Sequence, residues 1–151
     1  MAITYTTALE AVNTMLSAVG SSPISSLTGS LTADGVVAKN ILDEVTREVL
    51  SSGWAFNYER EVELAPDADD QVVLGQNVAR IDNSPGFNRA YDVVQRENKL
   101  YDRKSHSYTI TTTLTCDIIY FMEFNEIPEA ARRYIMTRAA RIFQDRMVGS
   151  G

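Results

Sequence analysis

The stretch from residue 124 to residue 149 constrains the fold most, because it predicts one long amphipathic helix. Pro128 takes the first helical position, where a missing N–H is tolerated, and Glu129 follows in the first turn. Gly149 is a suitable stop. Apolar residues recur at spacings of three and four, which gives a single stripe: Ala131, Ile135, Ala139, Ile142 and Phe143. Such a helix is stable only when this stripe packs against another element.

The other side of the same helix is rich in arginine. Its cations are Arg132, Arg133, Arg138, Arg141 and Arg146, against the carboxylates Glu129 and Asp145. The whole chain has a net charge of −6, so this segment is locally basic in an acidic protein. The asymmetry fits a contact between subunits, a contact with nucleic acid, or a solvated face with a local pair between Arg141 and Asp145. The segment alone leaves these three interpretations open.

Two further helices are predicted in the first third of the chain. Residues 8–19 follow Thr7, which has the position of an N-cap in a capping box with Glu10. Residues 33–52 follow Thr32 as N-cap, and Gly53 stands where a left-handed residue ends a helix. The Gly/Ser-rich stretch between the two helices predicts a loop.

The middle of the chain changes from a helical period to a period of two, which predicts β-strands. Large aromatic residues alternate with acidic ones in the first of them, so three glutamates are expected to share one face. A hairpin is expected around Glu97 and Asn98, because asparagine tolerates positive φ. The expected strands are 54–64, 71–74, 78–81, 91–96, 99–103 and 108–120.

These elements predict an α+β fold. Three helices are expected to form one layer or bundle, with a small antiparallel sheet inserted before the last helix. The expected division is a helical core from residues 1–53 and 124–151, and a β subdomain from residues 54–123.

The chain carries no recognisable catalytic pattern. It has one cysteine, Cys116, which sits in a strand pattern and is expected to be a small core residue, and one histidine, His106, in a polar stretch. Neither a phosphate loop, a zinc-ligand set nor a nucleophile elbow occurs, and the acidic run at residues 67–70 lacks the spacing of a calcium loop. We therefore expect no enzyme activity, no cofactor and no metal.

The composition and charge of the chain restrict the classes of partner that it can bind. The pI of about 4.8 argues against a general nucleic-acid binder, although an acidic wall suits a channel through which DNA slides. No apolar run is long enough to span a bilayer, and the first residues do not form a secretory signal. We expect assembly in a reducing cytoplasm without a membrane.

Several motifs, in this order and spacing, resemble the tail tubular protein A family of short-tailed bacteriophages, the head-to-tail adaptor. They are ALEAVNTMLSAVGSSPISSL, LSSGWAFN, LAPDADD, NVARID, KLYDR and FMEFNEIPEAARRYIMTRAARIFQDRMVG, which together run from residue 8 to residue 149.

The motif residues have structural roles in this interpretation. Gly53 ends the second helix, Trp54 fills the junction with the sheet, and Pro128 starts the last helix. The remaining motif residues are expected in a turn, in the second hairpin strand and in the helices: Phe56, Pro66, Asp67, Leu100, Tyr101, Asp102, Tyr134 and Phe143.

The resemblance implies a virion structural protein assembled in the host cytoplasm. It implies a dodecameric ring of copies of the chain, docked on the portal protein and joined to a tail nozzle of the tail tubular protein B type. Viral DNA would pass through this ring without sequence-specific binding. Cyclic rings use heterologous interfaces, so we hypothesise that Arg132, Arg133, Arg138 and Arg141 contact a neighbouring subunit or the portal.

Two other interpretations stay open. One is a different connector component, such as a head-completion or stopper protein, which only the docking position would distinguish from the adaptor. The other is an unrelated enzyme or ligand-binding module, which predicts a deep pocket with convergent polar groups and a stable monomer.

Overall fold

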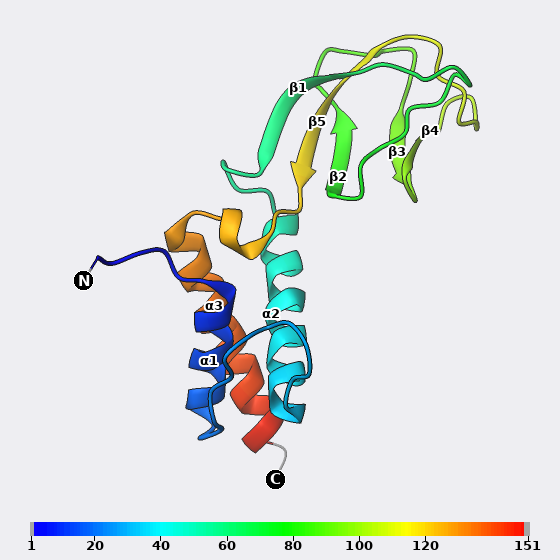
Figure 1. Ribbon diagram of the computed structural model, residues 1–151. Coiled ribbons are helices and arrows are strands. Elements are labelled where there is room, and N and C mark those ends of the chain that lie inside the picture. Colours follow the sequence, from blue (N-terminus) through cyan, green and yellow to red (C-terminus); the bar gives the residue numbers. More distant parts are fainter. Residues whose placement is uncertain (1, 150–151) are drawn as a thin grey trace. The chain divides into compact units, whose positions relative to one another are not determined.

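A computed structural model describes residues 2–149 and confirms the predicted α+β class, with helices and small antiparallel sheets in the expected order (Figure 1). The elements are α1 (Ala8–Ala18), α2 (Ala33–Ser51), β1 (Tyr58–Leu64), β2 (Val78–Asn83), β3 (Val93–Arg96), β4 (Lys99–Asp102), β5 (Leu114–Tyr120), the 3₁₀ turn η1 (Phe124–Glu126) and α3 (Glu129–Val148).

The chain divides into two compact units. The helical unit consists of Met1–Val49 and Met122–Gly151, and the β unit consists of Leu50–Phe121. The chain leaves the helical unit through the last turn of α2 and returns to it at Met122. That the two units are a helical core and an inserted β subdomain of one chain-spanning domain stays a prediction.

The helices α1 and α2 of the helical unit begin where the sequence predicts. The Thr7 hydroxyl accepts a hydrogen bond from the Glu10 N–H at 3.1 Å, and the Thr32 hydroxyl accepts one from the Gly35 N–H at 3.1 Å. Each cap satisfies a backbone donor that has no partner inside its helix. The core of this unit is apolar and almost fully buried: Val12, Met15, Leu16, Ile41, Leu42, Val45, Ile135, Ala139 and Phe143.

The last helix is shorter than predicted. Residues 124–126 form η1, and α3 begins only at Glu129, with Pro128 as its N-cap residue. Ile127 is extended, with φ −82° and ψ 142°, because the residue before a proline is disfavoured in the helical conformation. The helix predicted over residues 124–149 is therefore wrong for residues 124–127, whereas its predicted start at Pro128 is confirmed to within one residue.

The first sheet of the β unit has the strand order β1-β5-β2, with both pairs antiparallel. Its inner face joins one apolar core in which Ile81, Cys116 and Ile118 are buried. The prediction that Cys116 is a core residue is confirmed, since its side chain is fully buried. Burial, with a smaller effect of the charges on Asp117 and Asp82, raises the pKa of this thiol to about 11.

The strands β3 and β4 form a second, two-stranded sheet, so the predicted single sheet is wrong. The hairpin is confirmed, with Arg96 opposite Lys99, but the residue with positive φ is Glu97, at 54°, and not Asn98. Two predicted strand segments are also wrong. Residues 71–74 contribute only one bridge, from Val73 to Lys99, and residues 108–113 precede β5 without strand pairing.

The predicted strand at residues 54–64 starts late, at Tyr58, because residues 54–57 form a turn. A bulge lies between Glu59 and Val62, and Glu61 takes a φ of 54° there. Glu59 pairs with Ile118 and Glu63 pairs with Thr115, which are positions of opposite parity on β5. Paired residues share a face, so the bulge separates glutamates that the sequence places together.

Candidate assembly surface

The turn between α2 and β1 depends on a glycine. Gly53 has a φ of 79°, and its N–H donates to the Leu50 carbonyl at 3.2 Å. A Cβ at this position would lie 2.8 Å from Ile119 Cδ1. The predicted left-handed residue after the second helix is thus confirmed, and only glycine fits both the backbone and the space.

Asn57, rather than Trp54, fills the interior of this turn. Asn57 is 2 % exposed, and its amide donates to the carbonyls of Leu50 and Tyr120 at 2.8 and 2.9 Å. Its side-chain oxygen accepts the Trp54 N–H at 2.7 Å. Trp54 is 41 % exposed and stacks on Phe56 with ring centroids 6.3 Å apart. Buried asparagines that bond several backbone groups carry no periodic signal in a sequence, so this residue was missed as a structural position.

The motif residues Pro66 and Asp67 form the predicted turn. One Asp67 oxygen accepts the N–H groups of Asp69 and Gln71 at 2.9 and 3.0 Å. This is a local Asx arrangement in which the carboxylate serves the backbone of its own loop.

The motif residues Leu100 and Tyr101, in β4, point to opposite faces of the hairpin. Leu100 is fully buried, whereas Tyr101 lies on the outer face under the Arg96 guanidinium, which is 3.6 Å from the ring centroid. Tyr108 meets Tyr101 edge-on, with centroids 5.3 Å apart. A cation above a tyrosine and an edge-on pair are both favourable geometries, and they order this face of the hairpin.

Asp102 is a structural carboxylate. It is 2 % exposed and accepts hydrogen bonds from the Asp92 N–H at 3.0 Å and the Ser105 hydroxyl at 2.7 Å, among others. Burial alone would raise the pKa of Asp102, but the bonds from Asp92 and Ser105 outweigh it and hold the pKa below its ordinary value. The ionised carboxylate therefore anchors the loop that follows β4, which includes the exposed His106.

A shallow hollow of about 430 Å³ lies in the β unit, with Trp54, Arg60, Arg80 and Asp117 among its lining residues. Asp117 accepts the Ser84 hydroxyl at 2.6 Å, which, with the other bonds to it, lowers its pKa. Arg80 is paired with Asp82 at 3.2 Å. Asp117 and Arg80 thus already have partners within the unit. A pair of carboxylates for acid–base chemistry would instead include one group whose pKa is raised.

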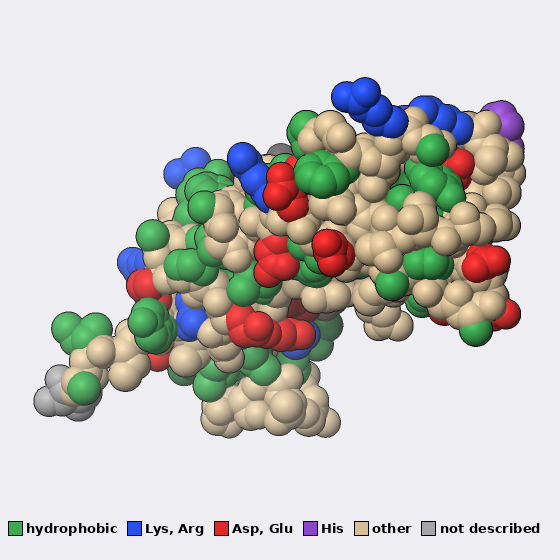
Figure 2. All heavy atoms as spheres, turned by 90° about the horizontal axis from the view of Figure 1, so that it is seen from above, with side chains coloured by type: hydrophobic (Ala, Val, Ile, Leu, Met, Phe, Trp, Pro, Cys, Tyr) green, Lys and Arg blue, Asp and Glu red, His purple; other side chains and the backbone are tan. Residues whose placement is uncertain are grey.

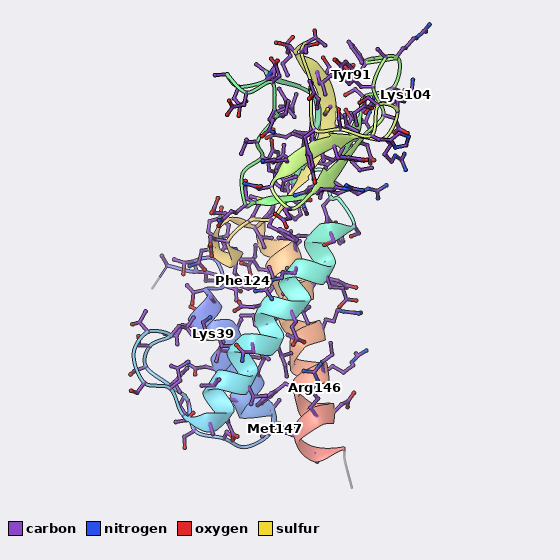
Figure 3. The ribbon with its side chains drawn as sticks, turned by 90° about the vertical axis from the view of Figure 1, so that its right-hand side faces the viewer. Lys39, Tyr91, Lys104, Phe124, Arg146 and Met147 are labelled. Carbon is purple, nitrogen blue, oxygen red and sulfur yellow. The ribbon has the colours of Figure 1, made fainter. Side chains whose placement is uncertain are left out.

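The four predicted interface arginines of α3 separate into different environments. Arg133 and Arg141 are exposed. Arg138 is also exposed, but it pairs with Glu48 of α2 at 2.7 Å. Arg146, which lies with Met147 near the end of α3 in Figure 3, pairs with Glu44 at 3.4 Å. In residues 2–149 the ion pairs of α3 go to α2, and Arg133 and Arg141 form none.

Arg132 lies inside the subunit and not on the polar face where the sequence analysis puts it. It is 6 % exposed and donates to the carbonyls of Ile127 at 2.6 Å, Thr6 at 2.7 Å and Asn125. These carbonyls belong to irregular backbone around the start of α3 and α1, where no helical N–H reaches them. Arg132 shares helical spacing with the buried Ile135, and that spacing is a signal for its burial.

Thr6 is held in place by Arg132 and by Glu129, the first residue of α3. Its N–H and hydroxyl donate to the two oxygens of Glu129 at 2.7 and 2.6 Å, while its carbonyl accepts from Arg132. The bonds from the Thr6 side chain and backbone lower the pKa of Glu129. Residues 2–5, which we call the arm, precede this anchor and are all exposed. In Figure 2 the arm projects at the lower left of the molecule.

The part of the chain that the structure describes contains no helix long and apolar enough to cross a membrane. Within the same residues, no group of three or more His, Cys, Asp or Glu side chains is placed to hold a metal ion.

In a comparison with protein families, the family model described as Tube, tail tubular protein, matches residues 9–151 of the chain. No curated protein matches the chain.

Proposed function

The chain belongs to the tail tubular protein family and is a structural component of the phage tail, and from this premise we propose that it is the head-to-tail adaptor. In this proposal, copies of the chain form a ring that joins the portal to the tail nozzle and lines part of the DNA channel. The protein has no catalytic role, in keeping with a structural family.

The observation that carries the proposal is the family match over nearly the whole chain. The exposed cations of α3 add a physical reason for self-assembly. Arg133 and Arg141 form no ion pair within residues 2–149, although the chain has a net charge of −6. In a heterologous ring they would face an acidic surface of the next subunit or of the portal.

The first test is electron microscopy of this protein mixed with the portal ring of its own phage. A second ring stacked on the narrow end of the portal is expected. A portal that stays bare at high protein concentration would refute the adaptor role. A head-completion or stopper protein is the second candidate, and a ring docked elsewhere on the connector would favour it.

The arginine contact is tested with the double variant Arg133→Glu and Arg141→Glu. We expect the ring on the portal to be lost while thermal unfolding of the subunit is unchanged, because both side chains are exposed. The double variant Arg89→Glu and Lys104→Glu changes the net charge equally in the exposed part of the β unit and should still assemble. Normal assembly of the α3 variant would refute the contact.

A further inference from the structure

We propose that the outer face of the β3–β4 hairpin binds the acidic strand β1 of a second copy of this chain. This face, which we call the basic hairpin face, consists of Val94, Arg96, Lys99 and Tyr101. The proposal rests on self-assembly of the adaptor and adds a second pair of surfaces. Both surfaces belong to the β unit, and they are separate from the arginines of α3.

Two cations stand directly opposite each other on the basic hairpin face. Arg96 pairs with Lys99 across the two strands, and paired residues share a face of the sheet. Like charges in this position repel each other and lower the stability of the hairpin. Neither side chain forms an ion pair within residues 2–149. A negatively charged partner would therefore relieve a repulsion that the folded subunit leaves uncompensated.

Two tyrosine rings hold these cations in place. The guanidinium carbon of Arg96 lies 3.6 Å from the centroid of the Tyr101 ring. The Lys99 Nζ lies 5.8 Å from the centroid of the Tyr108 ring, and the two rings meet edge-on at 5.3 Å. A guanidinium that stacks on a ring keeps the N–H donors at its edge free for a carboxylate. The face is thus ordered before a partner arrives, which reduces the entropy lost on binding.

The strand β1 carries the complementary charge. Glu59, Glu61 and Glu63 are exposed, and none of them forms an ion pair in the part of the chain that the structure describes. With Arg60 as the cation between them, the segment is acidic. Because β1 is the edge strand next to β5, its other side is open to another molecule. Charges on an edge can also serve only to prevent strand pairing, and a cross-link to Lys99 distinguishes the two roles.

The two surfaces lie on opposite sides of the β unit. The strand β1 is one edge of the three-stranded sheet and β2 is the other. The hairpin follows on the β2 side, where the Asn83 side chain accepts the Val93 N–H at 3.2 Å (Figure 1). A cyclic assembly needs two different faces of one chain that are complementary. A basic face on one side and an acidic strand on the other meet this requirement, which favours a second copy as the partner.

Nucleic acid fits the basic hairpin face less well. Proteins that bind single strands offer open aromatic rings on which bases stack, but the Arg96 guanidinium already covers the Tyr101 ring. The pI of about 4.8 also argues against a phosphate-binding protein. A carboxylate partner is therefore favoured.

Carbodiimide cross-linking tests the contact directly. The reagent joins a lysine amine to a carboxylate that touches it and takes up the water that is lost. Isotopically light and heavy chains are mixed and treated both free at high concentration and on the portal. We expect mass spectrometry to find Lys99 joined to a glutamate of β1 on the other chain. Lys99→Arg keeps the charge and should remove this product. Absence of the product in both conditions, or an equal yield from the exposed Lys104 of the same unit, would overturn the proposal.

Charge exchange provides an independent measurement. The hairpin variant has Arg96→Glu and Lys99→Glu, and the β1 variant has Glu59→Lys and Glu63→Lys. Each variant alone should need a concentration about ten-fold higher or more for assembly, because an attraction becomes a repulsion. An equal mixture of the two should assemble as the wild type does, since each altered surface then meets one of opposite charge. Normal assembly of either variant alone, or failure of the mixture when thermal melts show both variants folded, would overturn the proposal.

The remaining outcomes separate this contact from the adaptor role and from DNA binding. The variant Arg89→Glu with Lys104→Glu reverses two other exposed cations of the β unit and should assemble alone. A ring on the portal without the Lys99 product means that the hairpin proposal is wrong and the adaptor role stands. Lys99 products without a ring on the portal mean that the contact is real and the adaptor role is wrong. Binding of duplex DNA that the hairpin variant loses while its assembly is unchanged would overturn the proposal and assign the face to phosphates.

Discussion

Asn57 offers the sharpest test of how the β unit is held together. Its side chain makes three hydrogen bonds, all to backbone groups, at 2.7 to 2.9 Å. A hydrogen bond contributes roughly 0.5–1.5 kcal/mol net, so Asn57→Ala should cost about 3 kcal/mol. For a chain of this length that loss lowers the melting temperature by about 6–12 °C. The exposed Asn40→Ala should stay within about 0.5 kcal/mol of the wild type.

The variant Asn57→Asp distinguishes lost bonds from lost volume. It has nearly the same shape, but an ionised carboxylate would face the carbonyls of Leu50 and Tyr120, to which the amide now donates. This raises the pKa of the introduced carboxyl in the folded state. A raised pKa gives stability that is present below the unfolded value of about 4 and is lost as pH rises through the folded value.

Urea unfolding at several pH values between 4 and 8 is the assay. Relative to the wild type, Asn57→Asp should be the less stable of the two variants at neutral pH and should recover as pH falls, whereas Asn57→Ala should show a constant deficit. A deficit below about 1 kcal/mol for Asn57→Ala, or the same pH profile for both variants, would refute the reasoning.

Three further predictions follow from single residues. Arg132→Ala should destabilise by about 3–5 kcal/mol because it leaves buried carbonyls unpaired, whereas the exposed Arg133→Ala should have little effect in the same thermal melt. Gly53→Ala should lower the free energy of unfolding by about 1–3 kcal/mol. Adding Ile119→Val should restore the part of this loss that comes from the steric clash, because it removes the Cδ1 atom that a Cβ at position 53 would meet, and a double-mutant cycle measures that part. The lowered pKa of Asp102 gives stability that is present above its unfolded value near 4 and is lost on acidification, so Asp102→Asn should flatten the acid limb of the stability–pH curve.

The sequence alone was sufficient to predict the helix boundaries that depend on a single capping residue. Thr7, Thr32 and Gly53 act through hydrogen bonds or dihedral angles within a few residues, so a sequence pattern contains all the information that they need. The same holds for the turn at Asp67. Of these positions, Gly53 and Asp67 also lie in the motifs that carry the family resemblance, whereas Thr7 and Thr32 lie outside them.

Strand extents and faces depended on partners far along the chain. The alternation at residues 54–64 ignores the bulge that β5 imposes between Glu59 and Val62. The threonine-rich stretch at residues 108–113 has the composition of a strand. Such a composition shows only that the side chains suit a β-sheet; it does not show that a neighbouring strand is available for pairing. Whether these segments form regular strands depends on pairing with strands that lie far away in the sequence.

The arginines of α3 show why a count of charges is a weak guide to an interface. Of the four proposed for contact, Arg132 is buried against three carbonyls and Arg138 is paired with Glu48, which leaves Arg133 and Arg141. A contact through two exposed cations is screened over about 8–10 Å at 0.10–0.15 M salt and is weaker still at 1 M.

Ring occupancy on the portal, measured against the sodium chloride concentration, tests whether these two arginines carry the contact. Screening weakens a contact between exposed charges, so occupancy should fall as the salt concentration rises from about 0.1 M to about 1 M. Apolar burial is insensitive to screening and is strengthened by excluded salts such as sulfate. Occupancy that persists in chloride and rises in sulfate at equal ionic strength would therefore refute the arginine contact and assign the interface to apolar groups.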